Sequence, residues 1–331
     1  MESSPQPPLR GLSKGQVFEG FLLVKGAEIR PSANGSKYLD MTVADASGEV
    51  NAKLWDAAVP APPPGSIVKV RGMMLEFKDR PQLRVDKLRP VEDGDEIDRA
   101  ALVRVAPEEP EAMLREIEVR VAAIADGELR LVVEARLSES RGPLMYYPAA
   151  QRLHHAERSG LLHHMIGMLR VARALCEVYP SLDGDLLAAG VVLHDLCKIS
   201  ELSSNELGVV EEYTREGMLL GHLAVGAHKL LSACERLGVR GELADVLAHM
   251  ILSHHDLPEF GSPRRPMFPE AEALHVLDRL DARMYEMFNA LEGAPAGGYT
   301  EKIWSLERKL YRRESDGRDD GSRADGADPR S

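Results

Sequence analysis

Histidine and aspartate side chains gather in one part of this 331-residue sequence, in patterns that suit metal binding. All eleven histidines lie between residues 154 and 275, whereas residues 1–153 contain none. Several are adjacent to another histidine or to an aspartate, as in His154-His155, His163-His164, His194-Asp195 and His254-His255. Neutral imidazole nitrogens and carboxylate oxygens are ligands for Zn, Mn, Fe, Co and Ni ions. The sequence therefore predicts a metal centre with nitrogen and oxygen ligands.

The pair His194-Asp195 ends an apolar stretch, LLAAGVVLHDLCKI, that is typical of a buried helix. Successive residues on a helix are about 100° apart, so both side chains can converge on ions lying off the helix end. The carboxylate of Asp195 can bridge two metals. Further candidates lie in other predicted helices and complete a set of seven: His164, His194, Asp195, His222, His254, His255 and Asp278. Seven ligands exceed the needs of one ion, so we expect two metals that share Asp195.

Two neighbouring ions would polarise a phosphate and activate a water molecule, which predicts hydrolysis of a phosphate ester. Lys198 lies one turn after His194, where it could steady phosphate charge or help the leaving oxygen. Asp281 is an alternative to Asp278 because the two share a helix face. The remaining histidines fall into two groups. His154, His155 and His163 are candidates for binding substrate phosphate or for supporting the ligands, and His228, His249 and His275 are expected to be ordinary structural histidines.

The periodicity of apolar residues predicts the strands and helices of the chain. Residues 11–92 read as about five short strands, at 17–24, 37–44, 49–55, 66–74 and 82–88, which indicates a small all-β barrel or sandwich. Residues 93–107 are expected to be a linker. Helical spacing of apolar residues begins near 108, and predicts helices at 111–125, 128–139, 158–179, 184–198, 212–237, 240–255, 268–292 and 299–313. The ends, residues 1–10 and 314–331, are polar and are predicted to be disordered.

Composition narrows the functional classes. Hydrophobic residues make up 44% of the chain, yet there is no apolar run long enough to span a membrane and no apolar N-terminal signal. Three widely spaced cysteines fit a reducing cytoplasm. The net charge of −12 is uneven, because residues 11–92 carry 12 Lys and Arg against 10 Asp and Glu. The charge of the whole chain would disfavour a nucleic acid as partner, but a near-neutral N-terminal module joined to an acidic body differs from a uniformly acidic protein.

The order H…HD…H…HH…D resembles the HD-domain metal-dependent phosphohydrolases. The segments PAAQRLHHAERSGLLHHMIGM, VVLHDLCKI and ILSHHDLPEFGSPRRPMFPEAEALHVLDRLDARM, with the preceding GFLLVKGAEIRPSANGSKYLDMTVADASGEVNAKLWDA, are similar to the YhaM-type 3′–5′ exoribonucleases over residues 11–312. That resemblance implies an N-terminal OB-fold barrel followed by an all-α HD-domain bundle. Two departures from the family pattern are His163, where an acidic residue is expected, and Ser159, where a second glycine is usual.

By that resemblance, the metal-site residues are His164, His194, Asp195, His222, His254 and Asp278, with His255 as a less complete match. The expected cofactor is a pair of divalent transition ions, with Mn²⁺ favoured and Fe, Co or Ni as alternatives. The expected reaction is removal of nucleoside monophosphates from the 3′ end of single-stranded RNA, or of short DNA.

OB-fold barrels bind single strands with a basic groove and aromatic stacking platforms. Tyr38 and Trp55 are the favoured stackers, with Lys37, Lys53 and Arg84 as phosphate partners. Strand aromatics are more often core residues, so this assignment is a hypothesis. Further candidates of the same kinds are Phe21, Phe77, Lys78 and Arg80. Two other functions remain open: an HD-domain hydrolase of a small or cyclic nucleotide with a regulatory barrel, and a non-catalytic nucleic-acid-binding protein.

Overall fold

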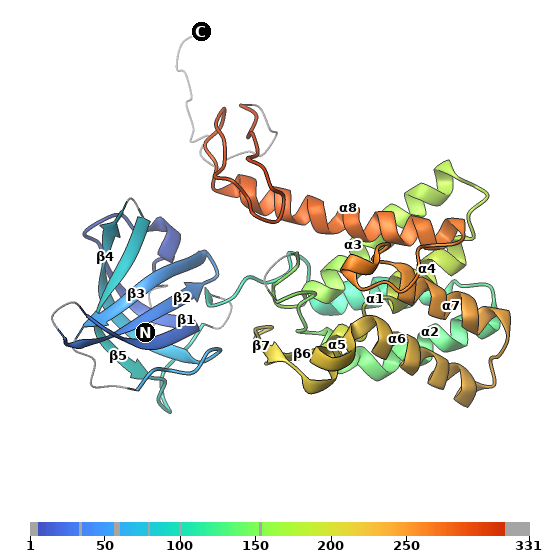
Figure 1. Cartoon of the computed structure of the whole chain (residues 1–331), viewed down its shortest axis with the longest axis horizontal. Coiled ribbons are helices and arrows are strands. Elements are labelled where there is room, and N and C mark those ends of the chain that lie inside the picture. The colour runs from blue at the N-terminus through green and yellow to red at the C-terminus, as the bar shows by residue number, and fades with distance from the viewer. Residues whose placement is uncertain are drawn as a thin grey trace, which may run out of the picture.

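The computed structural model describes residues 6–32, 35–55, 60–78, 80–98, 101–151 and 154–314. Figure 1 shows two parts, a β-barrel formed by the N-terminal region and a helical domain formed by the rest of the chain. The predicted fold class, an all-β barrel followed by an all-α domain, is confirmed. Most of the predicted C-terminal tail, from residue 315 onward, lies outside the described residues.

Five strands close the barrel, and each alternates between buried and accessible side chains. In β2, for example, Leu39, Met41 and Val43 are buried. This period of two directs every second side chain into the barrel core. The strands are β1 (Val17–Pro31), β2 (Lys37–Asp45), β3 (Gly48–Trp55), β4 (Ile67–Phe77) and β5 (Arg80–Pro90).

The strand order around the barrel is β1-β2-β3-β5-β4, closed by pairing of β4 with β1. The β3–β5 pair is parallel and the other pairs are antiparallel. A closed five-stranded barrel with this crossover has the topology of an OB-fold. Gly72 permits the close approach of β4 and β5, because a Cβ there would lie 2.3 Å from the carbonyl oxygen of Arg84.

The expectation of a disordered N-terminus is wrong for residues 6–10. The side chain of Gln6 exchanges two hydrogen bonds with the backbone of Phe21 on β1. Leu9 is buried in the barrel core, and its backbone N–H donates to Asp45 at 2.7 Å. These contacts satisfy the backbone of a short 3-10 turn at Leu9–Gly11 and attach it to the barrel. Residues 1–5 lie outside the described residues.

The helical domain packs its helices around one large apolar core. α8 runs along one side of it, at the top in Figure 1. Among the helices that the structure describes, none has the length and apolar character needed to cross a membrane. The helices are α1 (Pro110–Ala122), α2 (Gly127–Leu144), α3 (Gly160–Val178), α4 (Gly184–Leu193), α5 (Lys198–Glu201), α6 (Arg215–Leu237), α7 (Glu242–Ser253) and α8 (Pro269–Glu292).

The junction between the two parts contains a small apolar cluster. Leu102 and Val103 of the predicted linker are buried there with Leu23 of the barrel, against Leu207 and Val209 of the helical domain. The last two residues lie in the loop of a short hairpin, between β6 (Leu202–Ser204) and β7 (Val210–Tyr213), that the helical periodicity did not predict. The second half of the linker is therefore packed between the barrel and the helical domain.

The predicted helix at residues 299–313 is wrong. This segment folds back on itself beyond the end of α8, with bridges between Tyr299 and Tyr311 and between Ile303 and Arg308. Glu307 adopts a positive φ of 55°, which no right-handed helix allows. Backbone hydrogen bonds across the fold, such as Thr300 N–H to the carbonyl of Leu310 at 2.9 Å, take the place of helical ones, and the rings of Tyr299 and Tyr311 lie 5.1 Å apart.

Candidate metal centre

The seven predicted ligands come from five helices or helix ends and meet at one place. His164 lies in α3, and the His194-Asp195 pair follows the end of α4. His222 lies inside α6, the His254-His255 pair follows the end of α7, and Asp278 lies in α8. The predicted single helix over 184–198 is in fact two, because α4 ends at Leu193. That break places the His-Asp pair at a helix end.

Asp195 lies at the centre of the cluster and is 1% exposed. Its Oδ2 faces one group of rings, 3.4 Å from Nε2 of His194 and 3.7 Å from Nε2 of His164. Its Oδ1 faces the other group, 3.4 Å from Nε2 of His222 and 3.7 Å from Nε2 of His254. The two oxygens of one carboxylate thus point to two separate sets of imidazole nitrogens, which is the geometry of a bridging ligand.

Every imidazole of the cluster uses Nδ1 for a hydrogen bond to an acceptor. A carbonyl or an ionised carboxylate only accepts, so each Nδ1 carries a proton and Nε2 is the nitrogen left to bind a metal ion. These pairs are His164 with Asp281 (2.7 Å), His194 with the carbonyl of Val191 (2.8 Å), His222 with Glu201 (3.0 Å), His254 with the carbonyl of Ile251 (2.8 Å) and His255 with the carbonyl of Phe260 (2.8 Å). Outer hydrogen bonds of this kind orient metal-binding histidines.

Several buried atoms of the cluster have no hydrogen-bond partner among the described residues. They are Oδ1 of Asp195 and Nε2 of His222 and of His254. Burying a polar atom without a hydrogen-bond partner costs free energy of folding. Here the imidazole nitrogens and the carboxylate oxygen turn their lone pairs toward one another. Divalent cations between them would satisfy all three, so the residues present fit a metal centre. Nitrogen and carboxylate donors within 4.8 Å of one another include His164, His194 and Asp195 on one side and His222, His254 and His255 on the other.

Burial and neighbouring groups shift the pKa values of His164 and His254 in different directions. Burial lowers the pKa of His164, but hydrogen bonds to Asp278 and Asp281 outweigh it and raise that pKa to about 10. Burial together with the neighbouring His194 and His255 lowers the pKa of His254 well below its ordinary value. A metal ion therefore has to displace a proton on the side of His164 and meets a neutral ring at His254.

The geometry separates the roles of Asp278 and Asp281, which the sequence left open. Oδ1 of Asp278 lies 3.3 Å from Nε2 of His164, on the side where the cluster converges. Oδ2 of Asp281 instead accepts from Nδ1 of His164 and Nε2 of His155, both at 2.7 Å. Asp281 therefore lies behind His164, and it also connects that ring to the buried His155.

Backbone geometry in α6 places His222. Gly221 has φ 70° and ψ 162°, a conformation that suits glycine and kinks the helix one residue before His222. Glu201 then accepts from both the backbone N–H and Nδ1 of His222. A Cβ at Gly217 would lie 2.2 Å from the carbonyl oxygen of Glu201, so this glycine lets α6 pack closely against α5. Sequence reasoning missed Glu201, because 21 residues separate it from His222.

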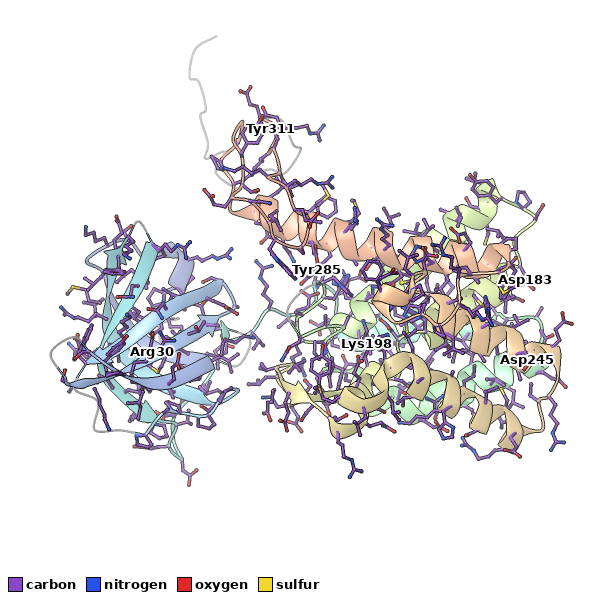
Figure 2. The ribbon with its side chains drawn as sticks, viewed as in Figure 1. Arg30, Asp183, Lys198, Asp245, Tyr285 and Tyr311 are labelled. Atoms are coloured by element: carbon purple, nitrogen blue, oxygen red, sulfur yellow. The ribbon has the colours of Figure 1, made fainter. Side chains whose placement is uncertain are left out.

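Lys198 lies in the interior of the helical domain (Figure 2) and is 8% exposed. Its Nζ lies 2.8 Å from Oδ2 of Asp195. Burial lowers the pKa of Lys198, but the carboxylates of Asp195 and Asp278 outweigh burial and raise it, so the amine is charged. Its ammonium group is thus fixed at the edge of the cluster, next to the central carboxylate.

The other histidines lie outside this centre. His275 donates from Nδ1 to the carbonyl of His254, and Nε2 of His249 accepts from the backbone N–H of Met267. His228 is exposed on α6. The ring of His154 lies 5.8 Å from that of His164. No cluster of potential ligands found among the described residues contains His228, His249 or His275.

The two departures from the family pattern have structural counterparts. Ser159 precedes α3 with a φ of 62°, a conformation that favours glycine. Its hydroxyl donates to the carbonyl of Met145 at 2.6 Å, which helps to hold this strained backbone. His163 points away from the metal centre and hydrogen-bonds Glu157 at 2.7 Å.

The barrel carries an aromatic and basic surface on the outer face of β2, β3 and β5. The rings of Tyr38 and Trp55 pack 4.7 Å apart, and Trp55 is 48% exposed. Nζ of Lys53 lies 4.9 Å from the Tyr38 ring, and Lys53 pairs with Arg84 on the adjacent strand. Lys37 precedes Tyr38, so its side chain leaves the opposite face of β2 and does not join this surface.

The other candidates on the barrel are divided between two places. Phe77 is exposed at the end of β4, with Nζ of Lys53 6.0 Å and Nζ of Lys78 5.6 Å from its ring. Arg80 pairs with Phe77 at the start of β5. Phe21 packs against the apolar cluster at the junction instead.

Comparison with known protein families identifies the helical domain. The HD domain family matches residues 161–283, the part that contains the seven candidate ligands. The chain is also similar, over about a quarter of its length, to chains of solved replication protein A structures, one of a heterotrimer bound to single-stranded DNA and one of the second OB-fold domain from Methanococcus maripaludis. These share 24% and 20% identity, cover 25% and 26% of this chain and 62% and 93% of those chains, and both have a TM-score of 0.20.

Similarity to full-length relatives extends over both parts of the chain. The 3′–5′ exoribonucleases YhaM of Geobacillus sp. (strain WCH70) and of Bacillus subtilis (strain 168) are each 38% identical over 300 residues. Those alignments cover 90% of this chain and 92% and 95% of the relatives. The YhaM of Halalkalibacterium halodurans is 35% identical over the same share of this chain and 93% of its own. The chain therefore belongs to the YhaM 3′–5′ exoribonuclease family.

Proposed function

We propose that the protein is a metal-dependent 3′–5′ exoribonuclease that releases nucleoside monophosphates from single-stranded RNA. The observation that carries this proposal is the common orientation of the imidazoles, whose Nε2 atoms face Asp195 and Asp278. Among the described residues, Nε2 of His222, Nε2 of His254 and Oδ1 of Asp195 have no hydrogen-bond partner. Nitrogen and oxygen lone pairs that face one another in this way are suited to binding cations. The family supplies the substrate and the direction, since its named members are 3′–5′ exoribonucleases.

The cluster divides into two ion positions that share Asp195. His164 and His194, with Asp278 facing His164, would hold one ion, and His222, His254 and His255 the other. Nitrogen-rich ligand sets favour Mn²⁺, Fe²⁺, Co²⁺ or Ni²⁺ over Mg²⁺, which prefers oxygen ligands and retains its waters. We favour Mn²⁺. A bound pair of ions supplies charge stabilisation for the phosphate and an activated water.

The chain's own residues fix the positions of these groups. Asp281 and Glu201 hold His164 and His222 from behind, so that each Nε2 points inward. Lys198 keeps its charge beside Asp195, close enough to attract a phosphate oxygen or to steady the leaving oxygen. His155 belongs to the support of His164 through Asp281 rather than to a phosphate contact. His154 is half-buried beside His164 and remains a candidate for contacting substrate.

The barrel would hold the strand while its 3′ end enters the metal centre. Trp55 and Tyr38 offer a stacking platform, and Lys53 and Arg84 offer positive charge on the same face. A strand-binding surface that is separate from the metal centre favours stepwise shortening of the RNA over internal cleavage. The described cysteines, Cys176, Cys197 and Cys234, are all free thiols, which is consistent with a cytoplasmic setting.

The test is digestion of a 5′-labelled single-stranded RNA of about 20 nucleotides, which exceeds the usual site of one OB-fold. Metal-stripped protein is supplied with Mn²⁺ or Mg²⁺, and Asp195→Ala is tested in parallel. We expect a ladder that shortens from the 3′ end, depends on Mn²⁺ and is absent in the variant. Intact RNA under every metal condition would overturn the proposal and favour a small or cyclic nucleotide as the substrate.

A further inference from the structure

A second group of possible metal ligands lies beside the catalytic cluster, on the other side of Asp281. It consists of His155 and Glu157 in the loop before α3 and His163 in the first turn of that helix. His155 is 2% exposed and Glu157 is 6% exposed. Tyr285 of α8 covers them, with its ring 4.1 Å from the ring of His155. Figure 2 shows Tyr285 on the half of α8 nearer to the barrel.

The hydrogen bonds of His155 leave one of its nitrogens without a partner. Nε2 lies 2.7 Å from Oδ2 of Asp281, and an ionised carboxylate can only accept, so Nε2 carries a proton. Nδ1 has no hydrogen-bond partner, although it is buried. It lies 3.7 Å from Oε1 of Glu157, too far for a hydrogen bond. A buried nitrogen lone pair thus faces a carboxylate oxygen with nothing between them.

The remaining contacts of Glu157 complete the group. Oε1 of Glu157 lies 2.7 Å from Nδ1 of His163, and Oε2 accepts from the hydroxyl of Tyr285 at 2.8 Å. His155, Glu157 and His163 each offer one ligand atom, and the three atoms lie within 4.8 Å of one another. The side chain of His163 is 24% exposed, and the group borders a surface cleft that Phe288 and Arg104 also line.

We propose that His155, Glu157 and His163 form a third divalent-metal site, distinct from the catalytic pair. Two nitrogens and one carboxylate oxygen suit a borderline transition ion such as Zn²⁺, with water from the cleft as a fourth ligand. Tetrahedral Zn²⁺ with bonds of about 2.0–2.1 Å separates its ligand atoms by about 3.4 Å. The 3.7 Å gap between His155 and Glu157 then closes by a few tenths of an ångström, and the shorter contact of Glu157 with His163 opens to admit the ion. His163 would lose its proton from Nδ1 and carry its ring proton on Nε2 instead, so that Nδ1 is free to bind the ion.

An ion at this site would support the catalytic cluster. Coordination through Nδ1 keeps the His155 proton on Nε2, where it donates to Asp281. Asp281 in turn accepts from Nδ1 of His164, which leaves Nε2 of His164 facing Asp195 and Asp278. The alternative occupant of the gap is a second proton on His155, which would also join Nδ1 to Glu157 but would bind no metal.

The test is a count of metal ions per chain, which does not depend on RNA cleavage. Full-length protein is stripped, exposed to Zn²⁺ or Mn²⁺, freed of excess ion and analysed by inductively coupled plasma mass spectrometry. Three variants accompany the wild type: Glu157→Gln, His163→Phe and, as the matched control, His228→Gln at an exposed histidine of α6. Cooperative thermal melting of each protein establishes that it is folded.

We expect Glu157→Gln and His163→Phe each to bind one equivalent fewer than the wild type and the control. Equal counts in all four proteins would overturn the proposal and assign the gap to a proton. If Glu157→Gln loses more than one equivalent, His163→Phe decides, because His163 hydrogen-bonds Glu157 and not Asp281. An unchanged count in that variant overturns the third site while leaving the exoribonuclease assignment intact.

Discussion

The substitution Glu201→Gln tests whether His222 holds a metal ion through Nε2. Glu201 accepts from Nδ1 of His222 at 3.0 Å and from its backbone N–H at 3.1 Å, and its side chain is 14% exposed. Glutamine keeps an acceptor oxygen but removes the negative charge that makes the imidazole a stronger ligand. Loss of such an outer partner weakens metal binding about 10- to 100-fold, or roughly 1.4–2.7 kcal/mol.

The assay measures the initial rate of RNA shortening as free Mn²⁺ is varied. We expect the Mn²⁺ concentration for half-maximal rate to rise about 10- to 100-fold in Glu201→Gln, with the rate largely restored at saturating Mn²⁺. The matched control is Glu212→Gln, because Glu212 lies exposed on the nearby strand β7. A half-maximal concentration equal to that of the wild type would refute the reasoning, since His222 would then not depend on its outer hydrogen bond to bind metal.

Further outcomes follow from the barrel, the loop before α3 and the metal itself. Trp55→Ala should weaken single-stranded RNA binding by about 1–3 kcal/mol, measured by fluorescence anisotropy, whereas the exposed Trp304 can be replaced by alanine without comparable loss. Gly160→Ala should lower stability by roughly 1–3 kcal/mol in urea unfolding, because its Cβ would lie 2.0 Å from the carbonyl oxygen of His155. Gly127→Ala is its control, since nothing lies within 4 Å of the added Cβ. Chelation should lower the melting temperature, because ions bind the folded chain.

Each of these three predictions has a result that would contradict it. Equal RNA affinities of Trp55→Ala and the wild type would exclude that tryptophan from the stacking platform. Equal urea midpoints for Gly160→Ala and Gly127→Ala would mean that the loop before α3 shifts without strain. A melting temperature that does not respond to chelation would contradict a metal centre built across five helices.

The spacing of apolar residues, every second residue in strands and every three to four in helices, predicted most of the fold. This spacing follows directly from which side chains are buried in the core. Alternation in residues 37–44 located β2, and helical spacing in residues 268–292 located α8 almost to the residue. The segment at 299–313 has helical spacing as well, yet it forms no helix. Its exposed side chains, such as Trp304, have no core to pack against, and periodicity cannot reveal whether a partner exists.

The identity of the candidate ligands could be predicted because adjacent histidines and aspartates are rare and local. Their support could not be predicted in the same way. Glu201 and Asp281 are ordinary acidic residues in the sequence, and the fold alone brings them to the outer nitrogens of His222 and His164. Alternation likewise could not tell which face of the barrel carries Trp55, whereas the structure places it outside.

The most direct test of the proposed activity compares a linear single-stranded RNA with a circle of the same sequence. Metal-loaded protein would be incubated with each, and products would be separated by length, with Asp195→Asn as the inactive control. We expect the linear RNA to be shortened stepwise to nucleoside monophosphates while the circle, which has no 3′ end, stays intact. Cleavage of the circle by the wild type, and not by Asp195→Asn, would show that the metal centre makes internal cuts and would contradict the account.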